Sequence, residues 1–217
     1  MNRTRMSRTM TDDAGNAHYF VKEPEVPSDP RTVEAEVRGH RLSFVTDRGV
    51  FSYGKVDRGS RLLAEKMDLP EEGSVLDWGC AWGLVGIVAA RTWPELSVVM
   101  VDINRRACDL ARRNVRRNDV EAQVICGDAL QVLAGRCFDA VLCNPPISAG
   151  RQAVLAMADQ AAEMLRAGGD LWMVAATKKG AKSLRRELEA RFATVARTAM
   201  RGGFRVYRAS EPVSTKG

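Results

Sequence analysis

Short apolar runs alternate with amphipathic segments from residue 74 onward, and this alternation constrains the fold more than any other feature of the chain. Five runs have the length and composition of buried strands: SVLDW (74–78), SVVMVD (97–102), AQVIC (122–126), DAVLC (139–143) and DLWMVAA (170–176). Such alternation predicts an α/β fold with a doubly wound, mostly parallel sheet and right-handed crossovers.

Helices and closing strands are assigned from the spacing of residues that share one face. Three helix faces hold Ala107, Leu110, Ala111, Asn114 and Val115; Val154, Ala158, Ala161, Ala162 and Leu165; and Leu184, Leu188 and Phe192. Two final strands over 193–199 and 203–209, joined at Gly202-Gly203, add an antiparallel hairpin at one edge. The predicted sheet therefore has seven strands.

The segment before the sheet divides into an arm and a small extension. Residues 1–30 are polar and end in three spaced prolines, which is typical of a flexible arm. Residues 41–53 are interpreted as two short strands around Asp47-Arg48-Gly49, and 56–69 as a short helix that ends before Pro70. We divide the chain into an arm (1–30), an extension with a hairpin and a helix (31–70), the sheet domain (71–210) and a tail (211–217).

Composition excludes several classes of protein. No apolar stretch reaches 18 residues and the N-terminus has no apolar signal-peptide core, so no membrane span or export signal is predicted. The odd number of cysteines and the absence of a C-x-x-C pair indicate reduced packing residues of a cytoplasmic protein. Both histidines, His18 and His40, precede the sheet, so no metal site is expected.

The net charge of +6 belongs to the folded body, because residues 1–40 hold six Lys and Arg against seven Asp and Glu. This excess is compatible with a polyanionic partner such as RNA. Two basic clusters are candidate phosphate contacts, with a solvated helix surface as the alternative for each: Arg105, Arg106, Arg112, Arg113, Arg116 and Arg117; and Lys178, Lys179, Lys182, Arg185 and Arg186. The second cluster is favoured, because it follows a predicted strand end.

The first strand leads into the glycine-bearing loop of VLDWGCAWGLVGI (75–87). Ligands of doubly wound sheets bind at the carboxyl ends of the strands. A dinucleotide site would need G-x-G-x-x-G, whereas the chain has Ala81 and Leu84 at the later positions. Asp77 with Gly79 and Gly83 instead follows the D-x-G-x-G pattern of class I S-adenosylmethionine (AdoMet) methyltransferases. Asp77 would then bind the amino-acid end of the cofactor; the alternative is a tight turn without a ligand.

Acidic residues also end the next two strands. Asp102 lies 25 positions after Asp77, and its carboxylate can accept hydrogen bonds from both hydroxyls of a ribose. Asp128 follows Gly127 at the third strand end, where it could accept the adenine amine. For both residues the alternative role is a helix cap.

The fourth strand ends in Asn144-Pro145-Pro146-Ile147. The two prolines fix the backbone and carry no N–H, so this corner presents carbonyl oxygens and one side-chain amide. Such a corner suits an –NH₂ group, held by its two hydrogens. Asp77, Asp102, Asp128 and Asn144 at four successive strand ends form a more specific pattern than any one of them alone.

With these motifs the chain resembles class I AdoMet methyltransferases that modify exocyclic amines, and most of all the RsmC-type small-domain family, in its compact NPPI subfamily. The segments that carry the resemblance are GVFSYGKVDRGSRLL (49–63), VLDWGCAWGLVGI (75–87), VDINRRACDLARRN (101–114), FDAVLCNPPISAG (138–150) and KKGAKSLRRELEARF (178–192). The resemblance implies methylation of a guanine (or adenine) amine in ribosomal RNA, with small-subunit rRNA or an assembly intermediate as partner.

The resemblance also implies roles for individual residues. The catalytic clamp would be Asn144, Pro145 and Pro146, and the site would be covered by Phe51, Asp57, Gly59 and Ser60. AdoMet would be bound by Asp77, Gly79, Ala81, Gly83, Asp102, Ile103, Asp128, Ala129 and Asn144. RNA would be contacted by Ile147, Lys178, Lys179, Lys182, Arg185 and Arg186.

Two departures from the family pattern keep other functions open. Ala81 stands where the family usually has glycine, and its methyl group would lower the affinity for the cofactor. Ile147 stands where many relatives have Tyr or Phe. The same clamp would also serve a protein glutamine or a small-molecule amine. A third hypothesis is a non-catalytic RNA-binding or scaffold protein with a degenerate AdoMet pocket.

Overall fold

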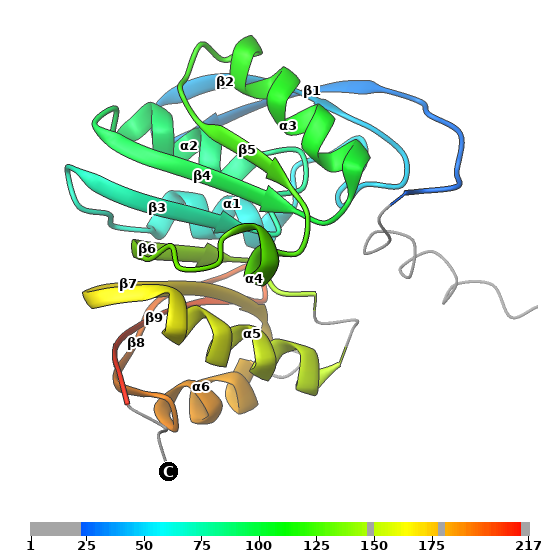
Figure 1. Ribbon diagram of the computed structural model, residues 1–217. Helices are drawn as coiled ribbons and strands as arrows, with labels where there is room; N and C mark the ends of the chain where they lie inside the picture. The colour runs from blue at the N-terminus through cyan, green and yellow to red at the C-terminus, as the bar shows by residue number, and fades with distance from the viewer. Residues whose placement is uncertain (1–22, 147–149, 178–180, 214–217) are drawn as a thin grey trace, which may run out of the picture.

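The computed structural model describes residues 23–146, 150–177 and 181–213 (Figure 1). Its main sheet has seven strands in the order β5-β4-β3-β6-β7-β9-β8, and β5, β4, β3, β6 and β7 are parallel. β9 and β8 run antiparallel at one edge. The predicted α/β fold, with its mostly parallel sheet and antiparallel edge hairpin, is confirmed.

The elements alternate along the chain as predicted from residue 73 onward. The extension contains β1 (Arg31–Val37), β2 (His40–Thr46) and α1 (Arg58–Lys66). The sheet domain contains β3 (Gly73–Trp78), α2 (Leu84–Thr92), β4 (Leu96–Asp102), α3 (Arg105–Arg117), β5 (Gln123–Cys126), α4 (Ala129–Val132), β6 (Phe138–Cys143), α5 (Arg151–Met164), β7 (Leu165–Ala176), α6 (Ala181–Glu189), β8 (Phe192–Arg201) and β9 (Phe204–Pro212). In the described part of the chain, no helix is long and apolar enough to cross a membrane.

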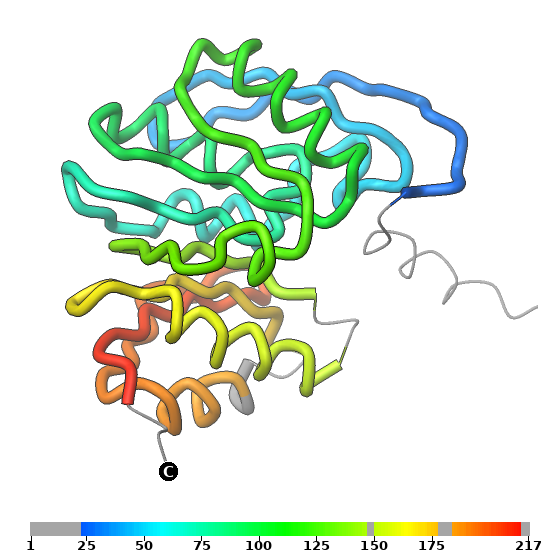
Figure 2. The backbone as a smooth tube through the Cα atoms, viewed as in Figure 1, coloured from blue at the N-terminus to red at the C-terminus, as the bar shows by residue number. Residues whose placement is uncertain are grey.

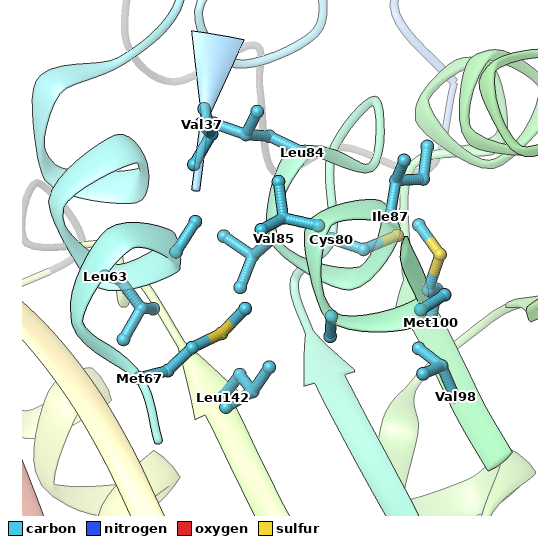
Figure 3. Packing of buried hydrophobic residues seen from close by; sticks show 14 of the residues in the cluster. Val37, Leu63, Met67, Cys80, Leu84, Val85, Ile87, Val98, Met100 and Leu142 are labelled. Atoms are coloured by element: carbon cyan, nitrogen blue, oxygen red, sulfur yellow. The ribbon is translucent and has the colours of Figure 1, made fainter. Parts of the chain in front are cut away.

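The sheet separates two hydrophobic clusters. One lies between the sheet and α1, α2, α3 and the β1–β2 hairpin, and the other lies between the sheet and α4, α5 and α6. Figure 3 shows part of the first cluster, in which Leu63 of α1 and Met67, directly after this helix, face Val85 of α2 and Leu142 of β6. Full burial of one such side chain contributes about 1.5–3 kcal/mol. This layer fixes α1 of the extension against the sheet.

The extension is attached to α3 by two buried asparagines one helical turn apart. Asn114 accepts from Val45 N (2.7 Å) and donates to Val45 O (2.9 Å), so its amide pairs with β2 as a neighbouring strand would. Asn118 makes the same pair of bonds with the backbone of Ser43, at 2.9 and 2.8 Å. Figure 2 shows the hairpin, in blue, alongside α3.

The predicted position of the N-terminal hairpin was wrong. The strands turn at Arg38-Gly39, where both residues have positive φ, as tight two-residue hairpin turns require. The segment 47–53 forms turns instead of a second strand. Its Asp47 carboxylate accepts from Ser28 Oγ and Asp29 N, both at 2.6 Å, and these contacts hold the segment as a loop.

Two smaller predictions also need correction. Phe192 belongs to β8, paired with Pro212, and not to the preceding helix, which ends at Glu189. β7 begins at Leu165 instead of residue 170, because Leu165 pairs with Phe138 before a register shift. The short helix α4 has no counterpart among the predicted elements, since four residues are too few for a helical period.

Candidate active site

A cavity of about 480 Å³ opens at the carboxyl ends of the parallel strands. This volume is in the range of small-molecule sites. The strand ends contribute Asp77, Asp102, Asp128, Asn144 and Ala176, and Phe204 closes the row on β9. The β3–α2 loop and the residues on either side of the α1 N-terminus complete the wall. The structure therefore brings together the four strand-end residues that the sequence singles out.

The β3–α2 loop is held against the neighbouring strand by its backbone. Gly79 N and Cys80 N donate to Val101 O at 2.8 and 3.0 Å. Gly83 has φ 100° and begins α2, and a Cβ at this position would lie 2.7 Å from Cε of Met100. Gly79 also has positive φ, and a Cβ there would meet no atom within 4 Å. Gly83 thus allows the loop to pack closely on Met100, whereas Gly79 leaves open space for a ligand.

Asp77 is the most deeply buried carboxyl group of the cavity, with 4% of its surface exposed. Its Oδ2 accepts from Gly86 N at 2.8 Å. Burial raises the pKa of Asp77 to about 7; the hydrogen bond from Gly86 opposes this rise, and the nearby charge of Asp102 adds a smaller part of it. A cationic ligand in this cavity would favour the ionised form of Asp77.

Gly86 is a position beside the Asp77 carboxylate that the sequence reasoning missed. A Cβ there would lie 2.7 Å from Met100 Cγ and 3.0 Å from Asp77 Oδ2, so only glycine lets α2 approach the carboxylate. The available signal was a glycine inside a predicted helix, where it costs stability unless close packing requires it.

Asp102 ties the β3–α2 loop to the end of β4. Its Oδ2 accepts from Ala81 N at 2.8 Å and its Oδ1 from Asn104 N at 2.9 Å. Burial raises the pKa of this carboxyl group as well. Asn104, not Asp102, caps α3, because Asn104 Oδ1 accepts from Ala107 N at 3.1 Å. Each Asp102 oxygen keeps lone pairs for the hydroxyls of a ligand.

Asp128 performs the capping role and faces the cavity as well. Its Oδ1 accepts from Leu130 N at 3.0 Å and caps α4. Asp128 and Ala129 both line the cavity, and Ile103 lines it next to Asp102. The two roles that the sequence left open for Asp128 are compatible, because a carboxylate has two oxygens.

The Asn144 side chain is oriented by the extension. Its Nδ2 donates to Ser60 Oγ (2.8 Å) and to Asp57 Oδ2 (3.2 Å). A carboxylate only accepts hydrogen bonds, so the nitrogen of the amide must face Asp57 and the oxygen must point elsewhere. Asp57 is itself fixed as the N-cap of α1 by the Ser60 backbone N–H, at 2.7 Å. Asn144, Pro145 and Pro146 all line the cavity.

Phe51 and Phe204 also line the cavity. Phe51 is 37% exposed, and its carbonyl accepts from Trp82 Nε1 at 2.9 Å. Phe204 lies against Gly59 of α1. Sequence reasoning missed Phe204, because nothing in its local pattern separates it from a strand residue of the core.

The two predicted basic clusters differ in how much of them the structure describes. On α3, Arg106 donates to Arg48 O (2.7 Å), Arg112 to Val124 O (3.2 Å) and Arg117 to Ser43 Oγ (2.8 Å). In the second cluster, Arg185 pairs with Glu189 at 2.7 Å and Arg186 also belongs to α6. Lys182 lies in α6, whereas Ile147, Lys178 and Lys179 lie outside the described residues.

Comparison with known sequences is consistent with this geometry. The methyltransferase small domain, as a family model, matches residues 41–208. Protein YbxB of Bacillus subtilis, described as uncharacterized, is 36% identical over 197 residues, which cover 89% of this chain and 98% of that protein. Ribosomal RNA small subunit methyltransferase C of Stutzerimonas stutzeri is 36% identical over 172 residues, covering 77% of this chain and 51% of the relative.

A solved structure gives the same result. RsmC of T. thermophilus, a 16S rRNA guanine N2 methyltransferase in complex with AdoMet and guanosine, matches with a TM-score of 0.76 and 28% identity. The match covers 87% of this chain and 52% of that one. The chain thus spans about half the length of the RsmC proteins it matches, and nearly all of YbxB. It belongs to the methyltransferase small-domain family.

Proposed function

We propose that this protein is an AdoMet-dependent methyltransferase that modifies the exocyclic 2-amino group of a guanine in small-subunit ribosomal RNA. The observation that carries the proposal is the orientation of Asn144. Asp57 and Ser60 hold its amide nitrogen, so its amide oxygen is the atom left to accept hydrogens from an amine. The relatives named RsmC support the choice of rRNA and guanine.

The residues of the cavity fit AdoMet. Asp102 has accepting capacity for two ribose hydroxyls after its bonds to Ala81 and Asn104. Asp77 provides a buried carboxyl group for the cationic amino-acid end, and the open side of Gly79 leaves room beside it. Asp128 and Ala129 line the part of the wall assigned to adenine. When bound, AdoMet supplies an activated methyl group on a positively charged sulfur.

The chain itself contributes positioning and electrostatics. The Asn144 side-chain oxygen and the Pro145 carbonyl accept the two hydrogens of the target amine. This leaves the nitrogen lone pair directed into the cavity. The proline corner has no backbone N–H to compete for that lone pair. Holding the amine in this way converts binding energy into orientation, and the reaction needs no strong base.

Replacement of Asn144 by alanine tests the proposal. Purified wild-type and Asn144→Ala proteins are incubated with radiolabelled AdoMet and small-subunit rRNA, and with total protein as an alternative acceptor. We expect label in RNA with the wild type and at least a hundredfold less with the variant, because the clamp acts in the transition state. Binding of S-adenosylhomocysteine by calorimetry should change by less than about threefold.

Two outcomes contradict the proposal. Equal methylation by Asn144→Ala removes the clamp assignment, and label in protein instead of RNA removes the acceptor assignment. No heat on titration of the wild type with S-adenosylhomocysteine favours the degenerate-pocket hypothesis.

The partner is proposed to be small-subunit rRNA, either free or in an assembly intermediate, which places the reaction in the cytoplasm. The net charge of +6 suits a polyanion. A guanine inside a helix must leave its base stack to reach Asn144, so single-stranded or flipped bases are the expected substrates.

A further inference from the structure

Four aromatic residues line the cavity: Phe51, Trp78, Trp82 and Phe204. Of these four, we single out Phe204, which lies near Asn144. A base taken out of its stack is normally held against apolar or aromatic side chains. The residue after the two prolines, Ile147, has no ring to offer. We infer that Phe204, at the start of β9, is the ring on which the target base stacks; the inference rests on the proposed function.

The order of the strands divides the cavity into two halves. The carboxylates of Asp128, Asp102 and Asp77 follow β5, β4 and β3, and Asn144, Ala176 and Phe204 follow as the row continues over β6, β7 and β9. The first half holds the groups assigned to AdoMet. Phe204 is therefore on the acceptor half, beyond Asn144 from the cofactor.

Contacts place the Phe204 ring beside the clamp. A Cβ built on Gly59 would lie 2.9 Å from two ring carbons of Phe204 and 3.0 Å from Asp57 Oδ2. This is the same carboxylate oxygen that accepts from Asn144 Nδ2. The ring, the carboxylate and the Asn144 amide thus meet around the first turn of α1. The Phe204 ring can contact the face of a planar base while the Asn144 amide contacts the amine of the same base.

The other three aromatic residues are less suitable. Trp82 is 2% exposed, and its ring packs on Phe44 at 5.0 Å. Phe51 is tied to the cofactor loop by the bond from Trp82 to its carbonyl. Trp78 packs with the second hydrophobic cluster, on the face of the sheet opposite α1, whereas Asn144 is held from the α1 side.

The β8–β9 turn fixes the position of Phe204. Gly202 and Gly203 both have positive φ, and Thr177 N donates to Gly203 O at 2.7 Å, which anchors the turn to the end of β7. Phe204 also pairs with Ala176, another residue of the cavity wall. The ring is part of a fixed wall of the cavity and packs on the first hydrophobic cluster.

The test uses 2-aminopurine riboside, which carries the same 2-amino group as guanosine and loses fluorescence when it stacks on a ring. It is titrated into protein saturated with S-adenosylhomocysteine. The wild type should quench the emission, Phe204→Leu should bind about tenfold more weakly with little quenching, and Phe204→Trp should restore it. Met200→Leu is the matched control, because Met200 lies on the same hairpin, is 60% exposed and does not line the cavity.

Equal affinity and quenching for Phe204→Leu and the wild type overturn the inference, and leave the proposed function intact. If the wild type does not methylate rRNA, the proposed function is contradicted. The riboside titration is a separate test, because it measures stacking without any methyl transfer. If Phe204→Leu also loses S-adenosylhomocysteine binding, Phe204→Trp decides. Riboside binding must change its indole emission by more than it changes that of the wild type, whose Trp78 and Trp82 also line the cavity, and an equal change in both proteins overturns the inference.

Discussion

At the scale of single residues, several polar groups around the cavity combine a contact within the fold with a role proposed for the site. Asp57 caps α1 and holds Asn144, Asp102 joins two loops and keeps lone pairs for a ligand, and Asp128 caps α4 at the cavity wall. Substitution of the carboxylates would therefore change folding and binding together. Residues whose contact serves only the clamp give cleaner tests.

Ser60 is such a residue, because its hydroxyl accepts from the Asn144 amide at 2.8 Å. In Ser60→Ala, Asn144 keeps only the longer bond to Asp57. A neutral hydrogen bond contributes about 1 kcal/mol, so we expect kcat for rRNA methylation to fall about five- to tenfold. The Kd for S-adenosylhomocysteine should not change. Ser60→Thr keeps the hydroxyl and is the control; an unchanged kcat in Ser60→Ala would disprove the orienting role.

Ala81 carries strain that depends on side-chain size. Its φ of 50° is in the left-handed region, which costs roughly 1–2 kcal/mol for a residue with a Cβ. In Ala81→Gly, relief of this strain offsets the greater freedom of glycine in the unfolded chain, so stability should stay within about 1 kcal/mol. Ala81→Val should lose about 2 kcal/mol, because β-branched residues tolerate this region poorly. Chemical denaturation measures both, and equal stability of the Val variant would contradict the argument.

At the scale of elements, the strands of the sheet domain were predictable, and the extension was only partly so. Runs such as AVLC (140–143) of β6 are apolar without a break because both faces of the sheet are covered. The hairpin was placed wrongly because its contacts are made with distant residues: Asp47 with Ser28 and Val45 with Asn114. The same limit applies to the site. The strand-end residues could be found from their positions in the sequence, whereas the places of Gly86 beside Asp77 and of Phe204 beside Gly59 depend on contacts between distant segments.

The attachment of the extension to α3 gives a prediction at this scale. In Asn114→Leu, the amide and carbonyl of Val45 and the carbonyl of Trp82, which accepts from Asn114 at 2.8 Å, lose their partner in a buried site. Each buried unpaired group costs about 1–3 kcal/mol, so the free energy of unfolding should fall by about 3 kcal/mol or more. Arg116→Gln, on the exposed side of the same helix, should stay within about 0.5 kcal/mol. A loss below 1 kcal/mol in Asn114→Leu would refute the role.

At the scale of the whole molecule, a buried acidic cavity lies in a protein with an excess of basic residues. Burial raises the pKa of Asp77 to about 7 and that of Asp102 in the same direction. The folded state therefore binds protons that the unfolded state has already released. A site of this kind lowers stability at neutral pH until a cation enters it.

The pH dependence of unfolding tests this statement. Because the pKa of Asp77 is higher in the folded state, its stabilising protonation is complete at low pH and is lost as pH rises through about 7. Between pH 5 and 8 this group should lower the free energy of unfolding by about 2–3 kcal/mol. Asp77→Asn should flatten that slope, whereas Asp109→Asn, at an exposed position, should keep it. Identical slopes for the wild type and Asp77→Asn would contradict the raised pKa.

The bond from Asn144 to Asp57 and Ser60 joins residues more than 80 positions apart in the sequence. The orientation of the Asn144 amide therefore depends on the N-terminal extension as well as on the sheet. A shortened protein that starts at residue 71 would keep every strand of the main sheet and every carboxylate assigned to the cofactor, but would lose the groups that orient the amide. It would also expose the side of α2 and α3 that the extension covers, so the extension supports both the fold and the proposed acceptor site.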